Sequence, residues 1–227
     1  MHRQERGKKY LAARNNGHLQ EVLDFHTAEL AAIPSLEDVM FIQTVSEAEA
    51  EGKLRGIYDG DQETFDYVPN HAKVFSLRPD VLAAWRGLQG SIRKNLPLRR
   101  YELVTLAAAQ ALNSRYCLLA HGAVLIKDGV GVDQLRAILT DFHDAGLEPA
   151  EVGMMDYAQR IARSANEIAQ ADVDALRALG LEDVEILDIA LTATMRCFAS
   201  KTFSALGAGS DAAFDELEDQ LSDLLPA

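Results

Sequence analysis

Cys117 and His121 are the side chains in this sequence with the clearest potential for chemistry, and they lie four positions apart inside a long apolar stretch. On an α-helix, residues i and i+4 share one face, ~6 Å apart along the axis, so the imidazole of His121 could reach the sulfur of Cys117. Asn113 and Ser114 have the residue types of a helix start, with Ser114 as N-cap and Cys117 in the first turn. Unpaired amide groups and the helix dipole favour negative charge there. The spacing therefore predicts a thiol that is stabilised as a thiolate.

Glu102 is the third candidate, because a carboxylate one turn into an apolar segment must be paired or protonated. On one straight helix, Glu102 and Cys117 would be ~22 Å apart. A site that contains both requires a break that folds the second segment back, so that Glu102 can approach His121. We therefore predict two separate helices, at about residues 98–112 and 114–127.

Each candidate also has a purely structural interpretation. A lone cysteine such as Cys117 is commonly a small buried hydrophobe, and His121 could be a hydrogen-bonded core residue. Tyr116 either donates a hydrogen bond in the pocket or packs as an ordinary aromatic residue. Cys197 is interpreted as a core or half-buried residue, with a role as resolving thiol as the alternative. Zinc bound by Glu102, Cys117 and His121 is chemically permissible, but the spacing matches no closed zinc site, so no metal is expected.

Composition limits the classes of partner. The chain has 227 residues, a formal net charge of −13 and a pI near 4.8, which argue against nucleic acid or an anionic membrane surface as the main partner. The longest uncharged run, residues 103–114, is too short to span a bilayer, and the basic N-terminus lacks the apolar segment of a signal peptide or anchor. Only two cysteines in a chain of this length are typical of a reducing, cytoplasmic setting.

Apolar periodicity predicts helices nearly throughout, and strand-like alternation is scarce, so we expect an all-α fold. Proline and glycine clusters divide the chain into helices of about ten to twenty residues. Residues 1–20 mix charges with few large apolar groups and are predicted to be an N-terminal extension. Residues 21–227 are predicted to form one all-α domain of two related halves, about 70–146 and 150–227.

An internal repeat becomes visible when the sequence is shifted by 83 positions. The matching pairs are Leu98 with Leu181, Glu102 with Glu185, Leu103 with Ile186, Leu106 with Ile189 and Ala107 with Ala190. The Cys/Ser pair is inverted between the halves, since Ser114 falls on Cys197 and Cys117 on Ser200. The second half has Ser204 where the first has His121, so only the first half can pair Cys with His. The halves are interpreted as a duplication, with generic amphipathic similarity as the alternative.

Two runs carry a resemblance to a known family. Residues 97–107 (PLRRYELVTLA) and 113–122 (NSRYCLLAHG) resemble the carboxymuconolactone decarboxylase and alkylhydroperoxidase D-like family. The similarity extends through residues 69–75, Arg78, Pro79, Trp85 and residues 180–185, and covers roughly residues 40–210. The resemblance implies an all-helical alkylhydroperoxidase D-like fold and a homo-oligomer, with a trimer or hexamer as our expectation.

The peroxidase branch of that family uses a Glu, a Cys-x-x-Cys pair and a His four residues after the second Cys. Glu102, Cys117 and His121 match this pattern. Ser114 departs from it, because it takes the place of the first cysteine. The decarboxylase branch lacks the cysteine pair, so this chain lies between the two branches.

Thiol-based peroxide reduction is the chemistry that the sequence favours. Cys117 would attack a small hydroperoxide and become a sulfenic acid, while His121, oriented by Glu102, moves the proton. Ser114 cannot resolve the sulfenic acid, so an external thiol reductant, a small molecule or a protein, is expected. The Ser114 hydroxyl would instead cap the helix or hydrogen-bond the thiolate. No cofactor is expected.

The sequence leaves two other functions open. One is a lyase acting on a small carboxylated ring, with His121 and Glu102 as acid and base and with Arg100 or Arg115 binding the substrate carboxylate. The other is a non-catalytic helical oligomer whose duplicated halves serve assembly.

Overall fold

The computed structural model describes residues 40–226, and within this range it contains helices and turns but no strand. The all-α prediction is confirmed. The helices are α3 (Gly52–Phe65), α4 (Asn70–Val74), α5 (Pro79–Arg93), α6 (Leu98–Ala111), α7 (Arg115–Lys127), α8 (Val132–Asp141), α9 (Pro149–Ser164), α10 (Gln170–Ala178), α11 (Asp183–Ala205) and α12 (Asp215–Leu221), with short 3₁₀ turns η1 (Ala165–Glu167) and η2 (Ala212–Phe214). The predicted boundary between residues 20 and 21 lies outside the described residues.

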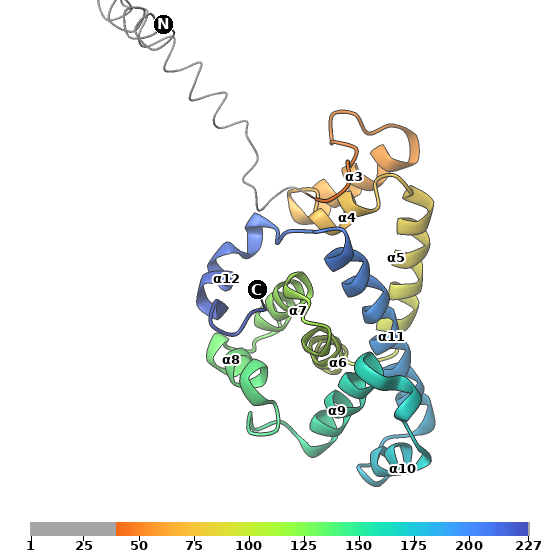
Figure 1. Ribbon diagram of the computed structural model, residues 1–227, viewed down its shortest axis with the longest axis vertical. Helices are drawn as coiled ribbons and strands as arrows, with labels where there is room; N and C mark the ends of the chain where they lie inside the picture. Colours follow the sequence, from red (N-terminus) through yellow and green to blue (C-terminus); the bar gives the residue numbers. More distant parts are fainter. Residues whose placement is uncertain (1–39, 227) are drawn as a thin grey trace, which may run out of the picture. The chain divides into compact units, whose positions relative to one another are not determined.

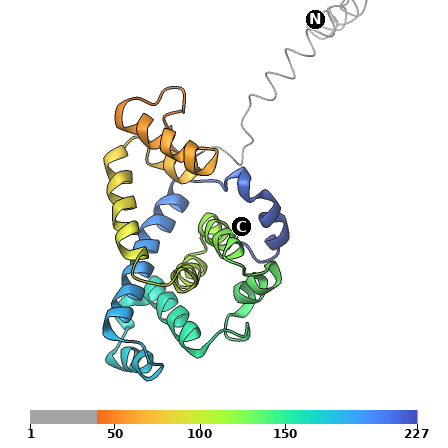
Figure 2. The ribbon, with the colours of Figure 1, turned by 180° about the vertical axis from the view of Figure 1, so that it is seen from behind.

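Helix α6 is the central element of the described part of the chain. Every residue from Tyr101 to Ala109 is buried, so the helix is covered on all sides. It packs against α7, α9 and α11, which surround it in both views of the ribbon (Figures 1 and 2). Glu102 therefore enters the core on a helix that has no exposed face in that stretch.

The predicted break between the two site helices is confirmed. Helix α6 ends at Ala111 and α7 begins at Arg115. Asn113 adopts a left-handed conformation with φ 51°, which asparagine tolerates better than most residues. The Ser114 amide then donates to the Ala109 carbonyl at 3.0 Å, which closes the turn. The chain reverses, α7 packs back on α6, and residues of both helices meet.

The corresponding segment of the second half forms one uninterrupted helix of 23 residues, α11. Arg196 occupies the position equivalent to Asn113, and arginine is a good helix former where asparagine is not. Glu185, the equivalent of Glu102, caps the start of α11 and pairs with Arg100 at 3.1 Å, so its contacts are structural. The two halves therefore differ at the point where the first one builds its site, and the duplication stays a prediction.

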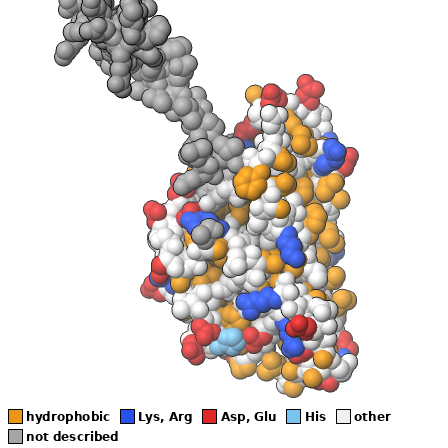
Figure 3. All heavy atoms as spheres, in the orientation of Figure 1, with side chains coloured by type: hydrophobic (Ala, Val, Ile, Leu, Met, Phe, Trp, Pro, Cys, Tyr) orange, Lys and Arg blue, Asp and Glu red, His pale blue; other side chains and the backbone are white. Residues whose placement is uncertain are grey.

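Hydrophobic side chains remain exposed on α5 and α11, which pack against each other. In Figure 3 they gather over α5 on the right-hand side. The exposed set comprises Val81 and Leu88 on α5 and Val184, Leu187, Leu191 and Phe198 on α11. None of the described helices is both long enough and apolar enough to cross a membrane.

Candidate active site

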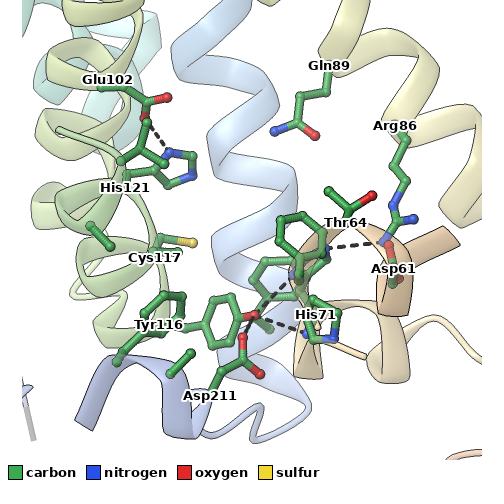
Figure 4. A pocket seen from close by; sticks show the side chains of 18 of the residues that line it. Asp61, Thr64, His71, Arg86, Gln89, Glu102, Tyr116, Cys117, His121 and Asp211 are labelled. Carbon is green, nitrogen blue, oxygen red and sulfur yellow. Dashed lines mark hydrogen bonds and ion pairs between the residues drawn. The ribbon is translucent and has the colours of Figure 1, made fainter. Parts of the chain in front are cut away.

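A cavity of about 680 Å³ lies between α5 and α7, with α6 and α11 behind it (Figure 4). Each wall is one face of a helix, as the spacing of the lining residues shows. The α5 wall consists of Trp85, Arg86, Gln89, Gly90 and Arg93, and the α7 wall includes Cys117, Ala120, His121, Val124 and Lys127. The structure thus brings Cys117, His121 and Glu102, the three predicted catalytic residues, to one cavity.

Cys117 lies in the first turn of α7, where the free amide groups of the helix start favour a negative charge. Its residue is only 1% exposed. Arg196 Nη1 donates to Cys117 Sγ at 3.4 Å, and Ser200 Oγ donates to it at 3.2 Å. Because the guanidinium can only donate, the sulfur is surrounded by groups that stabilise a thiolate.

His121 and Glu102 form a short, buried pair across the α6–α7 interface. Nδ1 of His121 is 2.6 Å from Oε2 of Glu102. Burial lowers the pKa of His121, and the charge of Arg196 lowers it further, so the imidazole is neutral near pH 7. A carboxylate only accepts hydrogen bonds, so the proton of the neutral ring is on Nδ1 and Nε2 carries a lone pair. The pair has the arrangement of a base with its orienting carboxylate.

The helix spacing allows a hydrogen bond between His121 and Cys117 that the described residues do not form. No hydrogen bond joins the imidazole of His121 to the sulfur of Cys117 anywhere in residues 40–226, although both lie on one face of α7. The physical reason is that each side chain has a stronger partner on another helix. Glu102 on α6 holds the imidazole, whereas Arg196 on α11 attracts the sulfur.

The expected role of the Ser114 hydroxyl is wrong. Ser114 does occupy the N-cap position of α7, but its side chain makes no capping hydrogen bond. Its Oγ is buried and has no partner among the described residues. The hydroxyl that contacts the Cys117 sulfur is that of Ser200, the residue equivalent to Cys117 in the proposed repeat.

Tyr116 belongs to a second polar network at the other end of the cavity. Its Oη donates to Oδ2 of Asp211 at 2.6 Å, in agreement with the interpretation of Tyr116 as a donor in the pocket. Since that bond uses the hydroxyl proton, Nδ1 of His71, 3.1 Å away, must be the donor to the tyrosine oxygen. Nε2 of His71 then accepts from Arg86 at 3.4 Å, and Arg86 also pairs with Asp61 at 2.8 Å (Figure 4).

Burial dominates the titration of this network. It raises the pKa of Tyr116 and that of Asp211, and it lowers the pKa of His71 to about 3, with Arg86 adding to the effect. His71 is therefore neutral in the folded protein. The network connects Tyr116 in the first turn of α7 to His71 on α4 and to Asp211, which follows α11, and so it holds the backbone next to Cys117.

Arg196 is the principal site residue that the sequence analysis missed. It is fully buried, and its Nε and Nη2 have no partner among the described residues. Burial opposes its charge, but the neighbouring Cys117, Tyr101 and Glu102 hold the pKa of Arg196 above its usual value. The sequence did contain a signal for it. Arg196 lies within the apolar stretch of residues 186–203, and like Glu102 in α6 a charged side chain buried there needs a partner.

The arginines expected to bind a substrate carboxylate are engaged elsewhere, so that expectation is wrong. Arg100 pairs with Glu185 at 3.1 Å, and Arg115 pairs with Glu218 at 2.6 Å. Neither lines the cavity, whose arginines are Arg86, Arg93 and Arg196.

Cys197 is half-buried and packs against the core, and it does not line the cavity. Burial raises the pKa of its thiol. Its role as a resolving thiol stays untested. Among residues 40–226, no group of three or more His, Cys, Asp or Glu side chains is placed to hold a metal ion.

The fold is all-α, and the site places one cysteine, Cys117, and the Glu102–His121 pair at a cavity between helices. Residues 79–160 match the family model described as the carboxymuconolactone decarboxylase family. A comparison with curated protein sequences gives no match.

Solved structures with this fold include two peroxidase-related proteins. An uncharacterized one from Ralstonia eutropha JMP134, with an alkylhydroperoxidase AhpD core, is 21% identical with a TM-score of 0.70, covering 83% of this chain and 98% of that one. Another from Silicibacter sp. TM1040 is 21% identical with a TM-score of 0.71, covering 80% of this chain and 96% of that one. A third similar structure is a cysteine-to-alanine variant of the debrominase Bmp8 in complex with 2,3,4-tribromopyrrole. It is 15% identical with a TM-score of 0.66, covering 85% of this chain and 98% of that one. The solved structures thus show that the chain has the alkylhydroperoxidase D-like fold, and its residues 79–160 match the carboxymuconolactone decarboxylase family model.

Proposed function

We propose that this protein is a thiol-dependent hydroperoxide reductase in which Cys117 is the nucleophile. The observation that carries the proposal is the environment of the Cys117 sulfur. The sulfur lies at the start of α7 and accepts hydrogen bonds from Arg196 and Ser200 on α11. A structural cysteine in an apolar core needs neither a buried guanidinium nor a hydroxyl at its sulfur, and burying that guanidinium costs free energy. The cost is explained if the thiolate is the working form of Cys117.

The reaction conserves atoms and electrons. The Cys117 thiolate attacks the terminal oxygen of the hydroperoxide, an S–O bond forms, the O–O bond breaks, and Cys117 becomes a sulfenic acid. His121 accepts the thiol proton at Nε2 and donates it to the departing alkoxide, while Glu102 stabilises the imidazolium between the two transfers. Because Cys117 and His121 are not hydrogen-bonded, the proton passes through the bound hydroperoxide or a water molecule.

The reductant must be an external thiol, because Ser114 stands where a resolving cysteine would be. Two thiols supply the electrons. The first forms a mixed disulfide with Cys117 and releases water, and the second displaces Cys117 and leaves an external disulfide. Arg196, Glu102 and His121 are regenerated unchanged in this cycle.

Mass spectrometry after one equivalent of hydroperoxide tests the proposal. Cys117 should gain one oxygen, and Cys117→Ser should abolish peroxide consumption. The matched control is Cys197→Ser, which should retain activity because Cys197 does not line the cavity. Full peroxide consumption by Cys117→Ser would refute the thiol mechanism.

A lyase that uses His121 and Glu102 remains the second candidate, because the short pair between them is a complete acid–base unit without the sulfur. Activity of Cys117→Ser on a small carboxylated substrate, lost in His121→Gln, would support the lyase.

We also propose that the chain forms a homo-oligomer, since α11 exposes Val184, Leu187 and Leu191 at helical spacing.

A further inference from the structure

The cavity face of α7 runs from the nucleophile to a positive charge. Cys117 is in the first turn of the helix and Lys127 is its last residue, ten positions later, so ~15 Å separate them along the axis. The lining residues between them, apart from His121, are Ala120, Ala123 and Val124. A reacting group at the sulfur and a charged group at Lys127 would therefore be joined by an apolar surface.

The opposite wall adds both a second cation and aromatic surface. Arg93 on α5 lines the cavity, is half-exposed, and approaches Oε1 of Glu102 only to 4.0 Å. Its guanidinium carbon is 6.0 Å from the centre of the Tyr101 ring. Trp85 and Phe203 line the cavity closer to the His71 network. Aliphatic side chains of α7 thus accompany the path from the sulfur to the cations, whereas Trp85 and Phe203 supply aromatic surface on the His71 side of the cavity.

Lys127 is the cation best placed to meet a ligand. It is exposed, and no acidic side chain within residues 40–226 pairs with it. By contrast, the acids that line the cavity are occupied, since Asp61 pairs with Arg86, Glu102 with His121 and Asp211 with Tyr116. A positive cavity end in a chain of net charge −13 is a local feature that concentrates anions.

Building on the proposed reductase function, we propose that the substrate is an organic hydroperoxide with a free carboxylate, separated from the peroxide by an apolar chain. Lys127 binds the carboxylate, with Arg93 adding positive potential, and the chain lies along Ala120, Ala123 and Val124. The peroxide then reaches Cys117, which reduces it as described above and releases the hydroxy acid. The volume of about 680 Å³ is within the range of cavities that enclose ligands of this size.

The test compares an acid with its methyl ester. The probes are the 13-hydroperoxide of linoleic acid and its methyl ester, which differ only in the negative charge. We expect the wild type to prefer the acid in kcat/KM by about two- to fivefold, the range that solvent-exposed ion pairs allow. Lys127→Gln should reduce this ratio to near one. The control is Lys94→Gln, which should leave the ratio unchanged, because Lys94 is exposed and next to Arg93 in the sequence but does not line the cavity. Equal kcat/KM for acid and ester in the wild type would overturn the proposal.

A binding measurement separates this proposal from the reductase function. Trp85 is the only tryptophan of the chain and lines the cavity, so its fluorescence reports entry of a ligand without turnover. The corresponding hydroxy acid should bind more tightly than its methyl ester, and Lys127→Gln should remove the difference. If the acid binds preferentially but Cys117 gains no oxygen, the reductase function fails and the carboxylate site stands. If Cys117 is oxidised by both peroxides at equal rates and Trp85 detects no preference, the carboxylate site fails alone.

Discussion

Replacing Arg196 with methionine separates chemistry from packing at this site. The guanidinium is fully buried and 3.4 Å from the Cys117 sulfur, so it is the strongest single influence on a negative charge there. Methionine is unbranched and of similar length, and it removes the charge and both unpartnered nitrogens. We expect Arg196→Met to slow the reaction of Cys117 with thiol reagents without unfolding the protein.

The magnitude follows from the distance. Two unit charges at ~4 Å interact by about 4 kcal/mol at an effective dielectric constant of ~20. The Ser200 hydroxyl and the amides of α7 remain in the variant and compensate part of the loss. Taking about half as lost gives ~2 kcal/mol, or roughly 30-fold in the alkylation rate at pH 7, at ~1.4 kcal/mol per factor of ten.

Iodoacetamide labelling followed by peptide mass spectrometry provides the assay. Cys197 is an internal control in the same sample, because its half-buried thiol lies outside the cavity. Arg196→Lys should give an intermediate rate at Cys117, since a cation is retained. Thermal unfolding should show an equal or higher Tm for Arg196→Met, because a buried guanidinium with two unpartnered nitrogens carries an uncompensated desolvation cost.

The result that would refute this reasoning is a Cys117 rate in Arg196→Met within twofold of wild type. A lower Tm with an unchanged rate would mean that Arg196 is a structural residue. In either case the reductase proposal would lose the observation that carries it.

Four further predictions address the rest of the structure. Ser114→Cys should allow a disulfide with Cys117 and raise turnover with a dithiol reductant several-fold, whereas the matched control Ser114→Ala should not; an unchanged rate in the cysteine variant would mean that position 114 cannot reach the sulfur. Burial lowers the pKa of His71 to about 3, so the stability that neutral His71 provides is present above its unfolded pKa of about 6.5 and is lost as the pH falls toward 3. Urea unfolding should therefore show about 2 kcal/mol less stability at pH 5 than at pH 7. The variant His71→Gln should flatten this dependence of stability on pH. Asn113→Ala should cost about 1 kcal/mol and a few degrees of Tm because φ is 51° there, while Asn113→Gly should be close to neutral. Leu187→Glu should reduce the mass seen by light scattering from that of a trimer or hexamer, and a monomeric wild type at micromolar concentration would contradict the proposed assembly.

The sequence by itself determined the helical class and the break in the site. Apolar spacing and the residues around Asn113 predicted two helices at 98–112 and 114–127, and the structure has them at Leu98–Ala111 and Arg115–Lys127. The proximity of Glu102 to His121 followed from that break, because a carboxylate in an apolar helix needs a partner and the reversal supplies one. These inferences succeed because they depend on local conformation and on residues within about twenty positions of one another.

The surroundings of the sulfur were decided only by the tertiary structure. Arg196 and Ser200 are 79 and 83 positions from Cys117, and they reach it because α11 packs against α6 and α7. Spacing along one helix predicted a contact between His121 and Cys117, but local geometry cannot weigh that contact against partners on other helices. The same limit hid the network in which Tyr116 meets His71 and Asp211, which are 45 and 95 positions away. Sequence periodicity identifies the face that a residue occupies, whereas the partner that it selects depends on the packing of helices distant in the chain.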